Sequence, residues 1–442
     1  MAVSTGNQQK SAPLATGTGN SREGSYVEVV VEVLTVSIFF DGTRNNRFNT
    51  EAGLKSEQQR KRDISYQNYY SNVALLHDGM ARELGVHEKI YIEGAGTEKY
   101  QLDDKLGLAA AEGRTGLGNR VYEALTELQA KCQGKDIRTL HINVYGFSRG
   151  AAFARNFCYQ LKNKKVARSP ELAKLAKKAN INLVGIFDTV SSVGVDHYND
   201  VEPFGLDIGK AEGIARVLHL TAQNDYRHHF PLTSISGAIK DGIGFECSFP
   251  GAHSDIGGGY PAVFYERHFY LGLDDTTHPD YHENWIDYRF FKNKGYYTDA
   301  QLALKPTTRN PKIHTVHANR VITFAYQFVF ADIMQSAISR FTPTKWLPSS
   351  FLKSHIAAMR ATPKLGSYCK SAHQYVMANI KKNASLAYPQ DAPREIYNQY
   401  IHNSLDYQNG AANKGSKGNK VKIGSKPVYI QAIRPEVTKG YR

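Results

Sequence analysis

A serine between two glycines is the residue of this chain whose setting is most typical of catalysis. Residues 146–150 read Gly-Phe-Ser-Arg-Gly, a G-x-S-x-G pattern centred on Ser148. In this pattern a sharp turn from a strand into a helix lifts a nucleophilic hydroxyl into solvent. Residues 139–145 have a strand pattern and residues 151–162 a helical one, and the glycines allow the close backbone approach that the turn needs. The alternative is a plain strand-to-helix connection with a buried serine.

An acid and a histidine further along the chain are candidates for the groups that activate a serine, a base and the carboxylate that orients it. Asp188 directly follows the strand pattern of residues 181–187, and His253 lies in a glycine-rich loop, residues 251–260. Parallel sheets place their sites at the carboxyl ends of strands. The order Ser, Asp, His is also that of α/β-hydrolases. We therefore predict an acyl-transfer site of Ser148, Asp188 and His253.

Other interpretations of these side chains stay open. Asp188 is also a candidate cap for a loop or a helix start, and His253 a candidate metal ligand or loop hydrogen-bonder. Asp255 lies two residues after His253 and competes with Asp188 as the orienting carboxylate. His219, within an apolar pattern that favours a helix, is interpreted as a packed core residue.

An acyl-transfer site also needs donors for the developing oxyanion. The backbone N–H of Arg149, at the start of the predicted helix, is one candidate. In this architecture the second donor comes from a loop after an earlier strand. We predict the Gly42 or Thr43 N–H, directly after the strand pattern of residues 27–40, with Asp41 in support. An acid followed by two asparagines is also compatible with a metal site, but the spacing matches no metal-binding loop, so no metal and no cofactor are expected.

Strand patterns alternate with helical ones through the first 260 residues, which predicts an α/β fold with a mostly parallel sheet. We predict a flexible tail (1–24), a catalytic core (25–260), an aromatic-rich and helical extension or cap (261–400), and a basic C-terminal segment (401–442). Within the extension, residues 321–334 and 354–380 are predicted to be helical, as are residues 69–84 earlier in the chain.

Composition excludes several classes of protein. The chain has 442 residues, 41% of them hydrophobic, and no apolar run long enough for a membrane-spanning helix. Its four cysteines form neither a disulfide scaffold nor a C-x-x-C pair. A net charge of +14 attracts phosphate, in nucleic acid or in anionic lipid, but no nucleic-acid-reading motif is present, so no nucleic-acid partner is expected. The N-terminal stretch lacks the apolar segment of a secretory signal peptide.

Five sequence blocks, all in the same order, resemble the α/β-hydrolase domain of the first class of type VI secretion lipase effectors. The resemblance spans about residues 35 to 260. The blocks are FFDGTRNN (39–46), GAGT (94–97), GFSRGA (146–151), FDTV (187–190) and FPGAHSDIGGGY (249–260).

This resemblance implies a phospholipase of the A type, with nucleophile, orienter and base on Ser148, Asp188 and His253. It also implies a phospholipid membrane as substrate surface, a type VI secretion spike or adaptor as carrier, and a cognate immunity protein. The expected localisation is the producer's cytoplasm, followed by delivery without a signal peptide into the target cell's periplasm. Two alternatives remain: a basic membrane-associating module with a weak or vestigial esterase, and a soluble esterase that acts on small esters.

Overall fold

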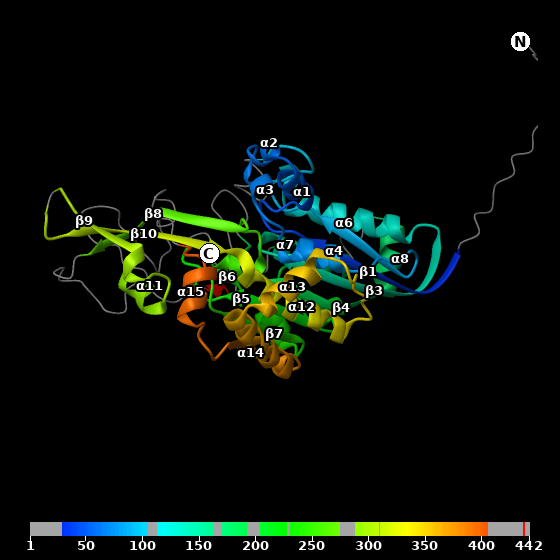
Figure 1. Cartoon of the computed structure of the whole chain (residues 1–442). Coiled ribbons are helices and arrows are strands. Elements are labelled where there is room, and N and C mark those ends of the chain that lie inside the picture. Colours follow the sequence, from blue (N-terminus) through cyan, green and yellow to red (C-terminus); the bar gives the residue numbers. More distant parts are fainter. Residues whose placement is uncertain are drawn as a thin grey trace, which may run out of the picture.

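A seven-stranded sheet in which every neighbouring pair is parallel forms the centre of the molecule (Figure 1). The computed structural model describes residues 29–104, 113–162, 169–191, 204–227, 230–274, 288–308, 310–404 and 436–437. In the order of the sheet, the strands are β11 (Ala384–Ala387), β7 (Gly244–Phe249), β5 (Val217–Ala222), β4 (Ala179–Phe187), β3 (Lys135–Phe147), β1 (Val29–Phe40) and β2 (His87–Ile92). The predicted α/β class with a mostly parallel sheet is confirmed.

Apolar runs in these strands explain why both faces of the sheet are covered. In β1, Leu34, Val36 and Ile38 belong to the core on one face, and Phe39 belongs to the core on the other. All four side chains are fully buried. Burial on both faces is typical of parallel sheets, whose crossover helices lie on either side.

Two groups of helices cover the two faces (Figure 1). One group is α6 (Leu117–Cys132), α7 (Arg149–Lys162) and α8 (Pro170–Lys178). The other is α4 (Asn72–Gly79), α12 (Gln327–Phe341), α13 (Phe351–Ala361) and α14 (Pro363–Asn379). The connection from β1 to α4 holds the short helices α1 (Arg47–Lys55), α2 (Glu57–Arg60) and α3 (Ile64–Gln67).

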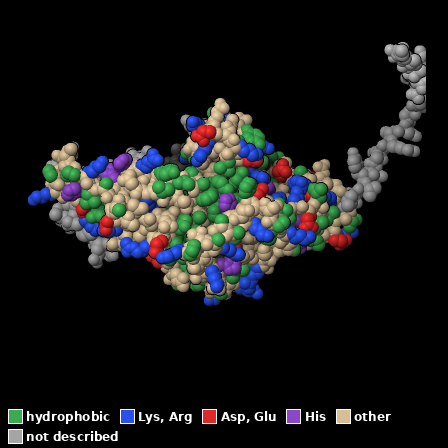
Figure 2. Space-filling view, viewed as in Figure 1, with side chains coloured by type: hydrophobic (Ala, Val, Ile, Leu, Met, Phe, Trp, Pro, Cys, Tyr) green, Lys and Arg blue, Asp and Glu red, His purple; other side chains and the backbone are tan. Residues whose placement is uncertain are grey.

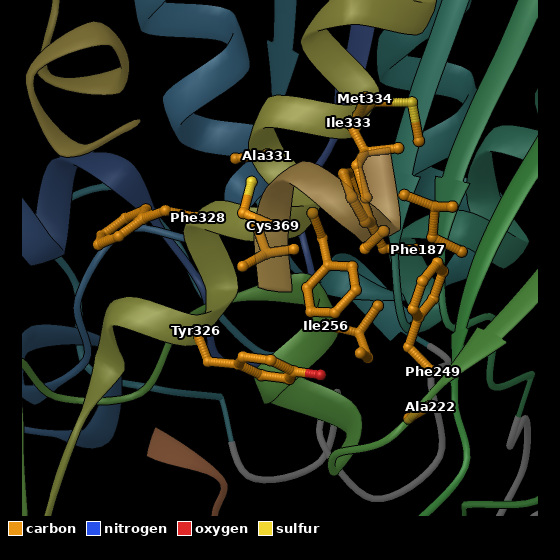
Figure 3. Packing of buried hydrophobic residues seen from close by; sticks show 14 of the residues in the cluster. Phe187, Ala222, Phe249, Ile256, Tyr326, Phe328, Ala331, Ile333, Met334 and Cys369 are labelled. Atoms are coloured by element: carbon orange, nitrogen blue, oxygen red, sulfur yellow. The ribbon is translucent and has the colours of Figure 1, made fainter. Parts of the chain in front are cut away.

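Residues beyond 260 share the core of the main sheet. Helix α12 packs over β4, where a Cβ added to Gly185 would lie 2.7 Å from the Met334 sulfur. Figure 3 shows Phe187 and Phe249 of the sheet in one cluster with Met334 and other side chains of this region. Strand β11 also extends the main sheet at its β7 edge. The residues before and after position 260 therefore form one packed unit.

A second, antiparallel sheet projects beside the main one (Figure 1). Its strands, in order, are β8 (Val263–Asp274), β10 (His314–Thr323) and β9 (Leu302–Pro306). The remaining elements include β6 (Leu232–Thr233), α9 (Ser236–Lys240), α10 (His253–Gly257), α11 (Tyr288–Lys294), α15 (Arg394–Tyr400) and β12 (Glu436–Val437), which pairs with β6. Among the described residues, no helix has the length and apolarity that crossing a membrane requires.

Several predicted elements differ from the structure. The helix predicted over 321–334 is wrong at its start, because β10 continues to Thr323 with side chains alternately buried and exposed. The long helix predicted over 354–380 divides at Pro363, the first residue of α14, since proline lacks the N–H that continues a helix. The helix predicted over 69–84 is shortened to α4. His219 is buried as predicted, but in strand β5 rather than a helix. The N-terminal tail and most of the basic C-terminal segment lie outside the described residues.

Candidate active site

The candidate residues lie where the strand order of the sheet reverses. Strand β2 pairs with β1 on one side, and β3 pairs with β1 on the other side. The connections that leave β1 and β3 therefore run in opposite directions along the sheet. Such a switch point opens a crevice at the carboxyl ends of the strands. Asp41 directly follows β1, and Ser148 directly follows β3.

Ser148 is the single residue between β3 and α7 and has a left-handed backbone, with φ of +58°. For a residue other than glycine this conformation costs about 1–3 kcal/mol and is found mainly at functional sites. Both flanking glycines are needed. A Cβ at Gly146 would lie 2.6 Å from the Gly150 carbonyl oxygen, and one at Gly150 would lie 2.2 Å from that of Asp41. The predicted strand–turn–helix context of Ser148 is present.

Asp188 and His253 are in direct contact. The His253 Nδ1 lies 2.5 Å from Asp188 Oδ2, and both side chains are buried. The other carboxylate oxygen, Oδ1, accepts the Ala222 N–H at 2.8 Å. Asp188 follows β4 with a left-handed φ of +40°, which turns its side chain out of the strand direction. The pair therefore has the geometry of a carboxylate that holds one imidazole tautomer, with Nε2 left to act as a base.

The surroundings of His253 favour a neutral imidazole. Burial lowers its pKa below the usual 6.5, and this effect outweighs the opposing one of the Asp188 carboxylate. The ring packs against Phe147, the neighbour of Ser148, with centroids 4.6 Å apart, and against Phe230 at 5.0 Å. Its backbone N–H donates to Asp225 Oδ2 at 3.1 Å. The imidazole is thus held beside the serine turn in the protonation state that a general base needs. The predicted loop around it is in part helical, because His253 begins α10.

Asp255, the competing carboxylate, has another partner. Its Oδ1 lies 2.7 Å from His402 Nδ1, and its Oδ2 accepts the N–H groups of Ala252 and His402 at 2.9 and 3.0 Å. Asp255 therefore links α10 to the segment after α15 and to the residue before its own helix. Sequence reasoning missed His402, because 147 residues separate it from Asp255 and no motif surrounds it.

The two predicted oxyanion donors of the β1 loop differ in their contacts. The Gly42 N–H donates to Asp41 Oδ1 at 2.8 Å, so in this conformation it is engaged inside its own loop. The Thr43 hydroxyl accepts a hydrogen bond from the Arg149 side chain at 2.6 Å, which joins this loop to the serine turn. Arg149 is the first residue of α7, whose positive end faces the same edge of the sheet. The Thr43 N–H is therefore the better candidate for the second oxyanion donor.

Asp41 is fully enclosed by donors. Its carboxylate accepts from Ser71 and Tyr91 hydroxyls, each at 2.5 Å, as well as from Gly42. Burial raises its pKa to about 6 in spite of these hydrogen bonds. In the described ranges, no group of three or more His, Cys, Asp or Glu side chains is arranged to hold a metal ion. The Asp41 oxygens are instead used to fix the loop.

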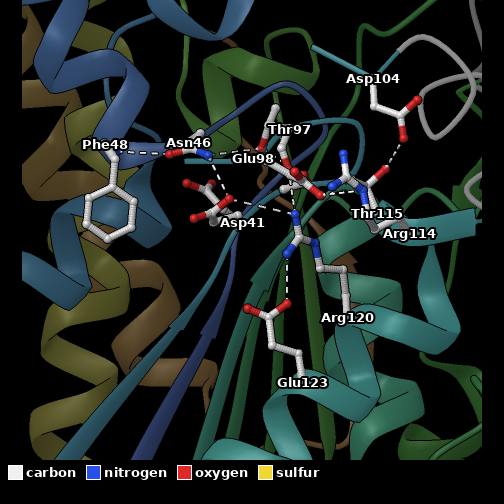
Figure 4. Close-up of polar contacts among 12 residues, drawn as sticks. Asp41, Asn46, Phe48, Thr97, Glu98, Asp104, Arg114, Thr115, Arg120 and Glu123 are labelled. Atoms are coloured by element: carbon white, nitrogen blue, oxygen red, sulfur yellow. Dashed lines mark hydrogen bonds and ion pairs between the residues drawn. The ribbon is translucent and has the colours of Figure 1, made fainter. Parts of the chain in front are cut away.

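A polar network behind this loop explains why two of the five sequence blocks lie together (Figure 4). The Asn46 side chain accepts from the first N–H groups of α1 and donates to Glu93 at 3.0 Å. Arg120 lies 3.7 Å from Glu93 and also contacts the Thr97 carbonyl. A Cβ on Gly94 would lie 1.8 Å from the Gly42 carbonyl oxygen, so the blocks at 39–46 and 94–97 meet without space for a side chain.

A buried pair supports Asp188 from behind. His219 Nε2 accepts the N–H of Thr189, the residue after Asp188, at 2.9 Å. The other ring nitrogen lies 2.8 Å from Glu246 Oε2. Sequence reasoning interpreted His219 as core only. Its position on β5, directly across from the β4 end that carries Asp188, is visible only in the sheet.

A family match was found for one part of the chain. Residues 159–268 match the family described as "T6SS, Phospholipase effector Tle1-like, catalytic domain". Among curated protein sequences, none matches this chain.

Two solved structures match this chain. "Structure of the Tle1 effector bound to the VgrG spike from the Type 6 secretion system" superposes with a TM-score of 0.56 at 19% identity, over 96% of this chain and 98% of that one. "Crystal structure of an uncharacterized protein from Pseudomonas aeruginosa" gives a TM-score of 0.44 at 18% identity, over 83% of this chain and 52% of that one. At such identities the first likeness shows the fold alone. The resemblance to the type VI secretion lipase effectors, which the five sequence blocks indicate, is confirmed by the family match over residues 159–268.

Proposed function

We propose that this protein is a phospholipase effector that hydrolyses acyl esters of membrane glycerophospholipids with Ser148, His253 and Asp188. The observation that carries the proposal is the 2.5 Å contact between Asp188 and His253, next to a serine held in a left-handed turn. The family match over residues 159–268 supports the lipolytic chemistry. The assignment of the three residues rests on their geometry.

The reaction follows from the roles of these groups. Ser148 Oγ attacks the ester carbonyl carbon while His253 Nε2 takes the hydroxyl proton, and Asp188 stabilises the imidazolium through Nδ1–H. The oxyanion is stabilised by the N–H groups of Arg149 and Thr43. His253 then gives its proton to the leaving alkoxide, which departs as a lysophospholipid. Water attacks the acyl-enzyme in the same way and releases a fatty acid, so Ser148 is restored.

We also propose delivery by a type VI secretion machine. The similar solved effector is described as bound to the VgrG spike. For this chain the corresponding partners are a spike or adaptor in the producer, an immunity protein that blocks the enzyme, and phospholipid on the periplasmic face of the target membrane. The basic charge of +14 favours an anionic lipid surface.

Hydrolysis by purified protein tests the chemistry. Vesicles of phosphatidylethanolamine and phosphatidylglycerol should yield lysophospholipid and fatty acid, and positional analysis of these products identifies the ester that is cut. Turnover of p-nitrophenyl butyrate alone would instead support a small-ester esterase. No turnover of either substrate, with retained vesicle binding, would support a membrane-associating module.

Toxicity in a bacterial host tests the compartment. The protein fused to a secretory signal peptide should harm a host without the immunity protein, and the same protein kept in the cytoplasm should harm it much less. Ser148→Ala should remove the toxicity of the exported form. Equal harm from both forms would contradict a periplasm-facing target.

A further inference from the structure

The outward face of the β8–β10 pair exposes a row of large apolar side chains. Val263, Tyr265 and Val321 are 43%, 54% and 53% exposed. The strand register sets Val321 opposite Tyr265, so the three side chains share one face. Their neighbours in the chain, Glu266 and Ile322, point inward and are buried. Strands with one buried face and one exposed face normally present polar residues to water, so this row is unusual.

A chain of aromatic contacts begins directly after β10. Phe324, just after β10, contacts Tyr69 with ring centroids 4.7 Å apart. Tyr69 contacts Tyr70, which stacks on Phe351 at 6.2 Å, and Phe351 is 58% exposed at the start of α13. We call the surface made by Val263, Tyr265, Val321, Phe324, Tyr69, Tyr70 and Phe351 the apolar face. Figure 2 shows hydrophobic side chains gathered in the middle of the side of the molecule that it views.

A hollow extends the apolar face between α1 and α13. It has a volume of about 290 Å³, and its apolar lining includes Leu54, Tyr70 and Phe351. The two cations of the lining pair with carboxylates of the same hollow, Arg47 with Asp78 and Lys55 with Glu51, so the hollow adds apolar surface to this face.

The apolar face adjoins the catalytic edge of the sheet. Ser71, the residue after Tyr70, forms a β-bridge with Gly258, which follows α10. The Ser71 hydroxyl donates to Asp41 in the candidate oxyanion loop. Gln327 connects the same parts, since it donates to the Tyr70 carbonyl and accepts the Gly259 N–H. A surface seated on the apolar face would therefore lie close to the loops after β1 and α10, which border the candidate active site.

Exposed cations accompany the apolar face. Arg267 lies over the Tyr265 ring at 4.9 Å, and Lys353 is exposed on α13. Within the described ranges, neither of these two cations forms an ion pair with a carboxylate. An apolar centre with unpaired cations beside it is complementary to a bilayer with anionic headgroups.

We propose that the apolar face is the surface by which this protein docks on an anionic phospholipid bilayer and places its catalytic edge against the lipid. The proposal rests on the proposed phospholipase function, because that function supplies the bilayer as substrate.

A quadruple variant tests the proposal: Val263→Thr, Tyr265→Thr and Val321→Thr, since threonine is polar and suits a strand, with Phe351→Gln on α13. The matched control is Leu84→Thr with Val86→Thr, since these side chains are 76% and 55% exposed in a turn before β2. Each variant is assayed on phosphatidylglycerol-containing vesicles and on monomeric p-nitrophenyl butyrate. The quadruple variant should lose about 10-fold or more on vesicles and keep its rate on the monomeric ester, because only the vesicle reaction needs docking. The control should keep both rates.

Sedimentation with the same vesicles, in the Ser148→Ala background, measures docking without hydrolysis. Binding should fall in the quadruple variant, and wild-type binding should weaken as salt is raised. Vesicle hydrolysis and binding equal to wild type would overturn the proposal and leave a protein partner as the occupant of this face. If the wild type hydrolyses neither substrate, the proposed function fails, and sedimentation still decides whether the apolar face binds lipid.

Discussion

Two buried histidine–carboxylate pairs meet at the short helix α10, and they differ in what lies beyond the imidazole. His253 contacts Asp188 at 2.5 Å, and Asp255 on the same helix contacts His402 at 2.7 Å. The His253 ring packs against Phe147, beside the nucleophile turn. The His402 ring stacks on Tyr260 with centroids 3.6 Å apart, and its Nε2 is buried with no hydrogen-bond partner in the described part of the chain.

His219 and Glu246 form a third buried pair. The His219 Nε2 accepts the backbone N–H of Thr189 and so fixes the backbone at that residue. The same two residue types therefore serve different purposes in one molecule. Among the three pairs, His253–Asp188 is the candidate for catalysis because its imidazole packs beside the turn that carries the candidate nucleophile.

Removal of the nucleophile should have the largest effect. Ser148→Ala should lower kcat by about 10⁵-fold or more on phospholipid, because no acyl-enzyme can form. The circular dichroism spectrum and Tm should stay close to those of wild type, since alanine loses only a hydroxyl. Turnover near the wild-type rate would contradict the assignment of Ser148.

Asp188→Asn should have the next largest effect. An amide in place of the carboxylate stabilises the wrong imidazole tautomer, and a loss of about 10⁴-fold in kcat is typical of such a change. Steady-state kinetics on a monomeric ester measures it without interference from vesicle binding. A loss smaller than that caused by Asp255→Asn would reverse the two roles.

Disruption of the second pair should act mainly on stability. Asp255→Asn leaves N–H donors of Ala252 and His402 with a poorer acceptor, so we expect a loss of about 1–3 kcal/mol in the free energy of unfolding. We expect kcat to fall only about 10-fold, through displacement of α10. Because both residues act in one contact, the effects of Asp255→Asn and His402→Phe on unfolding should be non-additive in a double-mutant cycle. Additive effects would show that the pair does not act as a unit.

Sequence predicted the parts of the site that depend on local pattern. Ser148 and Asp188 each follow a buried strand, and the spacing of Gly146 and Gly150 indicates a tight turn around Ser148. The positions of Ser148 and Asp188 in the fold could therefore be predicted. The contacts of His219 and His402 could not, because they join strands and segments that only the folded sheet brings together. The same holds for β11, a short strand far along the chain whose place in the main sheet no local pattern indicates.

The pH dependence of catalysis should sharpen the comparison further. His253 must be neutral to act as a base, and burial lowers its pKa below 6.5. The acid limb of kcat/KM should therefore have its midpoint below pH 6.5, with activity rising as pH increases through it. Since the Asp188 carboxylate raises this pKa, Asp188→Asn should move the midpoint to lower pH. A midpoint above 6.5 in wild type would contradict the role of burial at this imidazole.

Asp41 should produce an effect on stability that depends on pH. Its pKa is raised from 3.8 to about 6 because burial disfavours the charged carboxylate. The folded state therefore holds the proton more tightly than the unfolded state does, and this contribution to stability is complete below pH 3.8. It is lost as pH rises through about 6, by an amount on the order of 3 kcal/mol. Asp41→Asn cannot titrate, so its free energy of unfolding relative to wild type should rise between pH 4 and about 6.5 and then level off.

Chemical denaturation at a series of pH values measures this difference in the free energy of unfolding. The altered contacts with Ser71 and Tyr91 add a constant offset, which does not affect how the difference changes with pH. A difference independent of pH would show that Asp41 is charged throughout this range, and that its three donors outweigh its burial.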